Sequence, residues 1–265
     1  MNLNLENGWQ ILPIGGDTDT AYMGIKSDQK VFLKRNTSPF LAALSLEEIA
    51  PRLIWTKRIS TGDTLTAQEW LNGRSLYRSE MGQKSVSDLL YKVHHTPVLK
   101  KMLIQVGGKV VTPIDLVRKY FEGLPDDLNQ HPLLNKVANY LKANQPDLKS
   151  DFYEVCHGDL KHKNWLLSDK EKLYLVDWES ARIADPASDL SMLMCQYVPR
   201  KNWEQWLRQY GLEVNRDLWY RIYWYSLINL LLDVKYYHQR GRFTEMNQDL
   251  SLIHISEPTR RSYIS

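Results

Sequence analysis

The residues best suited to chemistry lie in one short polar stretch, HGDLKHKNW (157–165). Asp159 and Asn164 are five residues apart in a segment too short to hold another element, so both side chains could reach one bound ligand. Asp177 follows at the end of the apolar run LYLVD. Phosphoryl transfer needs such a set: a carboxylate that orients the attacking hydroxyl and accepts its proton, and hard oxygen ligands for Mg²⁺. Asn164 would supply a neutral oxygen ligand and Asp177 a charged one.

The same stretch also fits a plain surface turn, because Gly-Asp turns are common and basic residues such as Lys161 and Lys163 usually lie in solvated loops. The residues that follow favour the catalytic interpretation. Two apolar runs in NWLLSDKEKLYLVDW (164–178) flank the polar turn SDKEK, which predicts a β-hairpin directly after the loop. That hairpin would bring Asp177 to the same ligand from the far side, so the motif is supported by its context.

The elements expected before this motif form a small lobe, residues 1–72. Residues 8–35 alternate turn signals with the apolar runs WQILPI, AYMGI and VFLKR, which is typical of an antiparallel sheet. Helical spacing follows in LAALSLEEIAPRLIW (41–55), and strand-like runs then recur in RISTGDTLTAQEWL (58–71) and NGRSL (72–76). We therefore expect five strands and one helix in this lobe.

From residue 73 to residue 250 the pattern is mainly helical. Apolar residues recur at spacings of three and four in SVSDLLYKVHH (85–95), PIDLVRKYFEGL (113–124) and HPLLNKVANYLKAN (131–144). The Trp and Tyr residues between 203 and 237 also have helical spacing, so we interpret most of them as core and not as a cation-binding box. The expected fold class is α+β, with a small sheet lobe and a larger helical lobe.

The end of the chain, residues 251–265, breaks this pattern. Pro258 interrupts the helical spacing in LSLIHISEPTRRSYIS. We hypothesise that this tail is foreign sequence joined by read-through, and we assign it no function. Direct sequencing of the locus tests this, and a native stop after residue 265 would refute it.

Composition limits the classes of function. With 43% hydrophobic and 25% charged residues, the chain of 265 residues has an ordinary globular composition. Its net charge of +3 is small and spread along the chain, which gives no electrostatic footprint for nucleic acid or an anionic membrane. The most apolar stretch, WYSLINLLLDV (224–234), is broken by Asn229 and Asp233 and is far shorter than the ~20 residues of a membrane span. We therefore expect neither nucleic acid nor a membrane as partner.

The two cysteines, Cys156 and Cys195, cannot form a disulfide framework, and the segment MNLNLENGWQ lacks the basic and apolar regions of a signal peptide. We therefore expect a cytoplasmic protein. A zinc site formed by Cys156, His157 and His162 is disfavoured, because the sequence has no second cluster that would complete tetrahedral coordination.

The segments HGDLKHKN, LYLVDWE and DPASDLSML, with the hairpin between the first two, resemble the signature of the aminoglycoside phosphotransferase and choline kinase family. The likeness extends to about residue 250 and implies a two-lobed, protein-kinase-like fold that uses ATP and Mg²⁺. It implies that Asp159 is the catalytic base and that Asn164 and Asp177 hold magnesium on the nucleotide phosphates. His157 and Asp189 would be hydrogen-bonding supports of the loop.

The resemblance also implies a set of nucleotide contacts. Lys34, which ends the strand run VFLK, would contact the phosphates and pair with an acid of the following helix, Glu47 in preference to Glu48. Gly15 and Gly16 could bring backbone N–H groups over the phosphates, although a plain hairpin turn explains them about as well. The adenine edge would contact backbone groups of the segment between the lobes, which comprises Glu69, Trp70 and Leu71.

The segments AYMG, AQEWLNG and LYLVDWESARIADPASDLSMLM are further similar to a bacterial cell cycle regulator of this family. That similarity implies ribose or 2-deoxyribose as substrate, entering beside Trp178, and a link to cell-division or replication-initiation proteins at the division site. Aminoglycosides are polycations that need several carboxylates, whereas residues 217–240 contain only Asp217 and Asp233 as acids, so an antibiotic kinase is disfavoured. A choline kinase stays an alternative.

Two other classes of protein fit the sequence less well. A kinase-fold regulatory module would bind nucleotide and partner proteins with little turnover, but the polar positions expected of an active kinase are all present in this sequence. A protein kinase is disfavoured, because only eleven residues separate Asp177 from Asp189, too few for a peptide-binding segment. A small-molecule kinase is the expected class.

Overall fold

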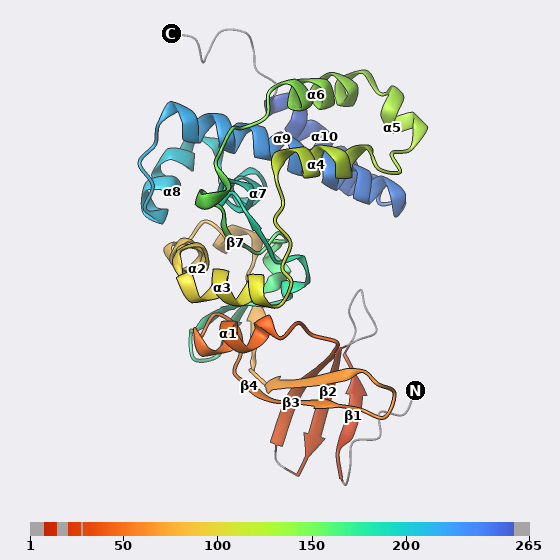
Figure 1. Ribbon diagram of the computed structural model, residues 1–265, viewed down its shortest axis with the longest axis vertical. Coiled ribbons are helices and arrows are strands. Elements are labelled where there is room, and N and C mark those ends of the chain that lie inside the picture. The colour runs from red at the N-terminus through yellow and green to blue at the C-terminus, as the bar shows by residue number, and fades with distance from the viewer. Residues whose placement is uncertain (1–7, 15–20, 28, 257–265) are drawn as a thin grey trace.

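The N-terminal lobe is a five-stranded antiparallel sheet with one helix (Figure 1). The computed structural model describes residues 8–14, 21–27 and 29–256. The strands have the spatial order β1-β2-β3-β5-β4, and their bounds are Gln10–Pro13 (β1), Ala21–Lys26 (β2), Gln29–Arg35 (β3), Leu53–Arg58 (β4) and Thr64–Glu69 (β5). The helix α1, Phe40–Leu46, connects β3 to β4.

Alternation along β3 and β5 decides which side chains this sheet buries. Val31 and Leu33 of β3 pack with Leu65 and Ala67 of β5 in a small core. Lys34 follows Leu33 and therefore points to the opposite face of the sheet. This alternation directs Lys34 toward the C-terminal lobe.

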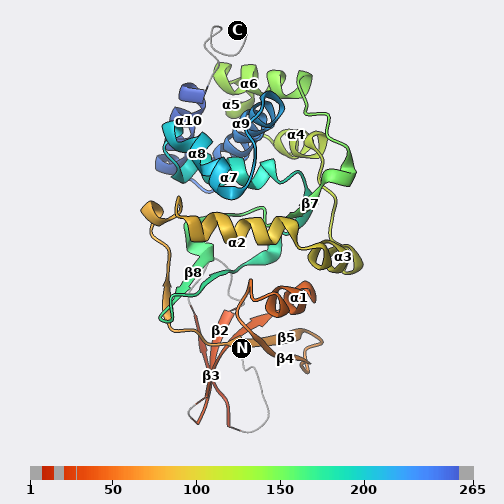
Figure 2. The same ribbon diagram turned by 90° about the vertical axis from the view of Figure 1, so that its left-hand side faces the viewer.

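The C-terminal lobe is mainly helical and carries two small sheets. Its helices are α2 (Lys84–His95), α3 (Pro97–Gln105), α4 (Pro113–Phe121), α5 (Asp126–Gln130), α6 (Pro132–Ala143), α7 (Ala187–Tyr197), α8 (Trp203–Tyr210), α9 (Arg216–Gln239) and α10 (Phe243–Ser256). Its strands are β6 (Gly73–Ser75), β8 (Trp165–Ser168) and β9 (Leu173–Leu175) in one sheet, and β7 (Glu154–Cys156) and β10 (Arg182–Ala184) in the other. Figure 2 shows α2 lying across the middle of the molecule, and α2 packs against α8, β7 and β9.

The core of this lobe is built around α9, which packs against α4, α6, α7 and α10. Trp206, Trp224 and Tyr225 are all buried, which supports the interpretation of the aromatic cluster as packing. Tyr236 and Tyr237 near the end of α9 instead line a cavity. In the described part of the chain, no helix combines the length and the apolar character that a bilayer crossing demands.

Three boundaries differ from the sequence-based expectation. The helix expected over residues 41–55 ends at Leu46, because Glu48 adopts φ +54° and Pro51 follows, and Leu53–Arg58 continues as β4. The strand within NGRSL does not join the N-terminal sheet; it is β6 and pairs with β8. At the end of the chain α10 continues to Ser256 with Ile253 buried, and residues 257–265 lie outside the described part.

Candidate active site

The loop between β7 and β8, residues 157–165, is called here the HGD loop. Gly158 has φ +78°, and a Cβ atom at this position would lie 2.6 Å from the carbonyl oxygen of Ser180. A side chain here would meet both backbone strain and a backbone clash. Glycine therefore allows the HGD loop to lie directly against the segment that follows β9.

Asp189, at the first turn of α7, fixes the start of the HGD loop. Its carboxylate accepts hydrogen bonds from the backbone N–H groups of His157 at 2.7 Å and Gly158 at 3.0 Å. Burial opposes ionisation of this carboxyl group, but hydrogen bonding to His94 and nearby positive charge hold its pKa below the usual value. Hydrogen bonds from several N–H donors favour the ionised form of a carboxyl group, which agrees with the lowered pKa of Asp189.

His157 supports the loop from inside. Its Nδ1 accepts from the backbone N–H of Asp159 at 3.2 Å, and its Nε2 lies 3.0 Å from the carbonyl oxygen of Val176. These two contacts assign the neutral tautomer with the proton on Nε2. Burial lowers the pKa of the ring, in agreement with a neutral imidazole. His157 therefore lies where a support is expected, and it connects the HGD loop to the strand before Asp177.

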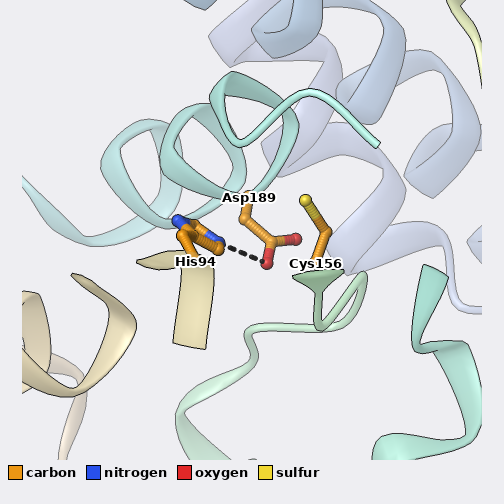
Figure 3. A group of neighbouring side chains, drawn as sticks. All are labelled: His94, Cys156 and Asp189. Carbon is orange, nitrogen blue, oxygen red and sulfur yellow. Dashed lines mark hydrogen bonds and ion pairs between the residues drawn. The ribbon is translucent and has the colours of Figure 1, made fainter. Parts of the chain in front are cut away.

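Figure 3 shows a buried group of His94 from α2, Cys156 from β7 and Asp189 from α7, whose ligand atoms lie within 4.8 Å of one another. His94 Nε2 is 3.2 Å from Asp189 Oδ2, and its Nδ1 is 2.7 Å from the Tyr210 hydroxyl. Cys156 Sγ lies 3.6 Å from the carbonyl oxygens of Ala184 and Asp185. Burial raises the pKa of the Cys156 thiol, so it stays protonated. These contacts fit a hydrogen-bond network that anchors the HGD loop, and not a metal site.

Asp159 and Asn164 face each other across the HGD loop. Asn164 Nδ2 donates to the backbone oxygen of Asp159 at 2.8 Å and to its Oδ2 at 3.2 Å. Lys161 Nζ lies 3.1 Å from Asp159 Oδ1. Asn164 Oδ1 has no donor among the described residues, so this oxygen can serve as a metal ligand. The two residues from the sequence motif are thus brought together.

Asp177 comes to the same place from the end of β9. It has φ +65° and ψ +63°, and the chain turns there into a short 3₁₀ segment, Trp178–Ser180. The backbone N–H of Val176 donates to the Asn164 carbonyl oxygen at 2.9 Å, which ties the hairpin to the HGD loop. Amide and carboxylate oxygens are hard ligands, so Asn164 and Asp177 fit Mg²⁺ by the chemistry of their donor atoms.

Lys34 reaches this cluster from the N-terminal lobe. Its Nζ lies 2.9 Å from Asp177 Oδ1 and 2.7 Å from Glu179 Oε1. Burial disfavours the charged lysine, but hydrogen bonds to Glu179 and Asp177 raise its pKa overall. Glu179 was not foreseen from the sequence; its place two residues after Asp177 was the available signal.

The expected pairing of Lys34 with Glu47 is wrong. Glu47 Oε2 lies 3.7 Å from Lys92, and Glu48 Oε2 lies 3.0 Å from Lys172. Both glutamates follow the early end of α1, and their carboxylates meet lysines of α2 and of the hairpin. The acids that neutralise Lys34 therefore come from the C-terminal lobe.

Other predicted nucleotide contacts have mixed outcomes. Glu69, Trp70 and Leu71 connect β5 to β6, that is, one lobe to the other. The backbone N–H of Glu69 donates to the Arg52 carbonyl oxygen at 2.8 Å, so it is not free to bind adenine. Gly15 and Gly16 lie outside the described residues.

Trp178 is not placed as a substrate contact. Its indole Nε1 donates to the Leu175 carbonyl oxygen at 2.8 Å, and its ring packs edge-on against Phe40 and His157. It is absent from the described residues that line the adjacent cavity. The Trp178 side chain therefore stabilises the turn after β9, because its hydrogen bond to Leu175 directs the ring into the fold.

A cavity of about 1030 Å³ opens beside Asp159 on the C-terminal lobe. Its described lining contains more Lys and Arg than Asp and Glu side chains, with Tyr236 and Tyr237 on one side. Asp233 of α9 lies in it and accepts from Gln196 Nε2 at 3.1 Å. Burial raises the pKa of Asp233 to about 6. The cavity is where an acceptor molecule could meet Asp159.

Comparisons with known proteins agree with this arrangement. The family model described as "Phosphotransferase enzyme family" matches residues 13–225, well over half of the chain. Among solved structures, choline kinase LicA from Streptococcus pneumoniae shares 16% identity with a TM-score of 0.68, over 94% of each chain. Spectinomycin phosphotransferase APH(9)-Ia, in complex with ADP and spectinomycin, shares 17% identity with a TM-score of 0.66, over 96% of this chain and 93% of that one.

A third structure, the GDP and kanamycin complex of APH(2")-IIIa, shares 14% identity with a TM-score of 0.67, over 94% of this chain and 93% of the other. At these identities the likeness concerns the fold. The expected kinase-like fold, with an antiparallel five-stranded N-terminal sheet, one helix and a helical C-terminal part, is confirmed.

Proposed function

The chain belongs to the phosphotransferase enzyme family, and from this premise we propose that it is an ATP-dependent small-molecule kinase with Asp159 as its catalytic base. The supporting observation is that Asp159, Asn164 and Asp177 border one cavity, while Lys34 joins Asp177 from the other lobe. In this proposal the acceptor hydroxyl lies beside Asp159 and the ATP phosphates lie beside Lys34.

The proposed reaction places each residue in one role. The acceptor oxygen bonds to the γ-phosphorus, the bond from that phosphorus to the β-γ bridging oxygen breaks, and the hydroxyl proton passes to Asp159. Lys161 and Asn164 hold the Asp159 carboxylate in place through its two oxygens. Mg²⁺ held by Asn164 and Asp177 would neutralise charge on the nucleotide phosphates. Lys34 would steady the same phosphates.

We propose a hydroxylated sugar of pentose size as the acceptor, ribose or 2-deoxyribose in the first instance. The described lining of the cavity holds more Lys and Arg than Asp and Glu side chains, which disfavours the cationic choline and aminoglycosides relative to a neutral sugar. The sequence similarity to the bacterial cell cycle regulator CcrZ supports a pentose. It also supports a proposed role in cell cycle and replication-initiation control, in the cytoplasm and at the division site with division or replication-initiation proteins.

The experiment is phosphorylation of a panel of ribose, 2-deoxyribose, choline and an aminoglycoside, with ATP and Mg²⁺ and with product masses recorded. The full-length parent is compared with Asp159→Ala and with Asp169→Asn, an exposed control in the hairpin turn. We expect a sugar phosphate from the parent and the control and none from Asp159→Ala. Equal product from Asp159→Ala and the parent would contradict the role of Asp159.

One contact favours a second candidate, a nucleotide-binding regulatory module with little turnover. Lys34 forms ion pairs with both Asp177 and Glu179. The Asp177 carboxylate, which is expected to bind Mg²⁺, is therefore already neutralised. Calorimetric titration with ATP, alone and with Mg²⁺, distinguishes the two. Tight ATP binding that Mg²⁺ does not change, without product on any acceptor, would favour the regulatory module.

A further inference from the structure

Arg182 of β10 places a positive charge against the HGD loop at Gly158. Its Nη1 and Cζ atoms lie 3.0 Å and 3.2 Å from the point where a Cβ on Gly158 would be. The guanidinium thus packs directly on the HGD loop, one residue before the proposed base. Arg182 lines the same cavity as Asp159.

Arg182 has no partner that accounts for its position. Its Nε is buried and makes no hydrogen bond, and no carboxylate of the described residues lies within ion-pair distance of the guanidinium. Asp189 is near enough to feel its charge, but that carboxylate already binds two backbone N–H groups and His94. A half-buried arginine normally has its donors paired, so the unpaired guanidinium points to a ligand.

Lys119, in the last turn of α4, is a second cation at the same place. Burial and the charge of Arg182 both lower the pKa of Lys119, with Asp233 opposing them. No described carboxylate lies within ion-pair distance of its ammonium group either. Two neighbouring cations repel each other, so their placement beside the proposed acceptor site is electrostatically unfavourable in the absence of a ligand.

The position of Lys119 is fixed from behind. The buried ammonium group of Lys235, in α9, donates to the carbonyl oxygens of Lys119, Tyr120 and Glu122. It therefore caps the end of α4 and holds the backbone that carries Lys119. The backbone at Lys119 is thus fixed, while its side chain is exposed at the cavity wall.

Most of the acids nearby are already engaged; the exception is Asp249, whose buried Oδ2 has no hydrogen-bond partner and whose pKa burial raises to about 7. Asp159 pairs with Lys161, Asp177 and Glu179 pair with Lys34, and Asp233 accepts from Gln196. None of these carboxylates lies within ion-pair distance of Arg182 or Lys119. The net positive potential at this wall would repel a cationic acceptor and attract an oxyanion.

We propose that Arg182 and Lys119 bind an oxyanion, a phosphate monoester or a carboxylate, carried by the acceptor molecule itself. This inference rests on the proposed phosphotransfer to a sugar hydroxyl and replaces the neutral pentose by a pentose that carries an anionic group, with a pentose phosphate as the first candidate. The acceptor hydroxyl meets Asp159 while the anionic group meets the cation pair, because both line one cavity. Arg182 supplies several N–H donors in one plane, a geometry suited to phosphate and carboxylate oxygens.

Binding is measured by calorimetry on the full chain, with a non-hydrolysable ATP analogue and Mg²⁺ present so that the nucleotide site is filled. The probes are ribose, ribose 5-phosphate and ribonate, which separate a neutral sugar, a phosphate ester and a carboxylate. The variants are Arg182→Gln and Lys119→Gln. Arg240→Gln is the matched control, because Arg240 is an exposed cation that lines the same cavity and stacks on Tyr236.

The parent should bind at least one of the two anionic sugars roughly tenfold or more tightly than ribose, since hydrogen bonds to charged groups are worth about 1.5–3 kcal/mol each. Arg182→Gln should remove most of that preference while leaving ribose affinity unchanged, Lys119→Gln should remove part of it, and Arg240→Gln should change neither. Thermal unfolding of each variant verifies its fold.

Three results would overturn the proposal. They are equal parental affinity for all three probes, no binding of either anionic probe, and an equal loss for ribose and the anionic sugars in Arg182→Gln. The last result, together with slower ATP turnover on every acceptor, would assign Arg182 to the transferred phosphoryl group. Failure of the proposed function looks different: the anion preference and its loss in Arg182→Gln persist, but no acceptor is phosphorylated.

Discussion

Replacing Asp189 with asparagine tests whether the buried network positions the HGD loop. The carboxylate accepts from the backbone N–H groups of His157 and Gly158, at 2.7 and 3.0 Å, and lies 3.2 Å from His94 Nε2. Asn has the same shape but only one carbonyl oxygen. Its NH₂ group would face an N–H donor, so at least one backbone N–H loses its acceptor inside a fully buried site.

Hydrogen bonds to charged groups contribute about 1.5–3 kcal/mol, and a buried unsatisfied N–H costs about 1–3 kcal/mol. We therefore expect Asp189→Asn to lower the free energy of unfolding by about 2–4 kcal/mol. Urea unfolding at neutral pH measures this, with Asp169→Asn as an exposed control expected to change it by less than about 0.5 kcal/mol. Because the HGD loop carries Asp159, kcat should also fall while ATP affinity stays near the parental value.

An Asp189→Asn protein as stable as the Asp169→Asn control and equally active would show that the buried network does not position the HGD loop. The pH dependence adds a second criterion. The folded pKa of Asp189 lies below its unfolded value, so its stabilisation is present above the unfolded pKa of about 3.8 and is lost as pH falls through the folded pKa. The stability difference between parent and variant should therefore shrink in acid.

Three further predictions concern neighbouring residues. Asp233→Asn should raise the free energy of unfolding at pH 8, by at most ~3 kcal/mol for a shift from 3.8 to about 6. The raised folded pKa means that the parental stability from Asp233 is complete below the unfolded pKa and is lost as pH rises through about 6, so the gain should vanish near pH 4; an equal gain at both pH values in urea titrations contradicts this. Gly158→Ala should cost about 2–4 kcal/mol in urea unfolding, against about 1 kcal/mol for Gly62→Ala, which has φ +88° but nothing within 4 Å of its Cβ position; equal costs would show that the contact at position 158 does not matter. Lys34→Met should raise the KM for ATP and lower kcat/KM by about 10²-fold or more, whereas Lys30→Met on the same strand should leave both unchanged; steady-state kinetics that treat the two variants alike count against the phosphate role.

The local sequence pattern was sufficient to predict that Asp159, Asn164 and Asp177 lie close together. Asp159 and Asn164 are close in sequence, and the polar turn inside residues 164–178 predicts the hairpin that returns Asp177 to them. These elements depend on short-range alternation and turn chemistry, which a single sequence carries. The separation into a sheet lobe and a helical lobe follows from the same periodicities.

Long-range partners could not be obtained this way. Lys34 pairs with Asp177 and Glu179, which are more than 140 positions away, and not with the nearby Glu47. The helical spacing in residues 41–55 gave no indication of the turn at Glu48, because positive φ in a glutamate has no sequence signature. The sequence predicts that Trp178 contacts the substrate, but in the structure its indole N–H donates to the Leu175 carbonyl oxygen inside the fold. The unpaired cations Arg182 and Lys119 come together only through tertiary structure.

The central claim is that Asp159 accepts the proton of an acceptor hydroxyl during phosphoryl transfer from ATP. Single-turnover phosphorylation of the best acceptor, with ATP and Mg²⁺ saturating, measures that step in the parent and in Asp159→Asn. Loss of a general base lowers the rate by about 10²–10⁴-fold, and ATP affinity should change little, since the ATP phosphates are assigned to Lys34, Asn164 and Asp177. An Asp159→Asn rate within about threefold of the parent would contradict the account.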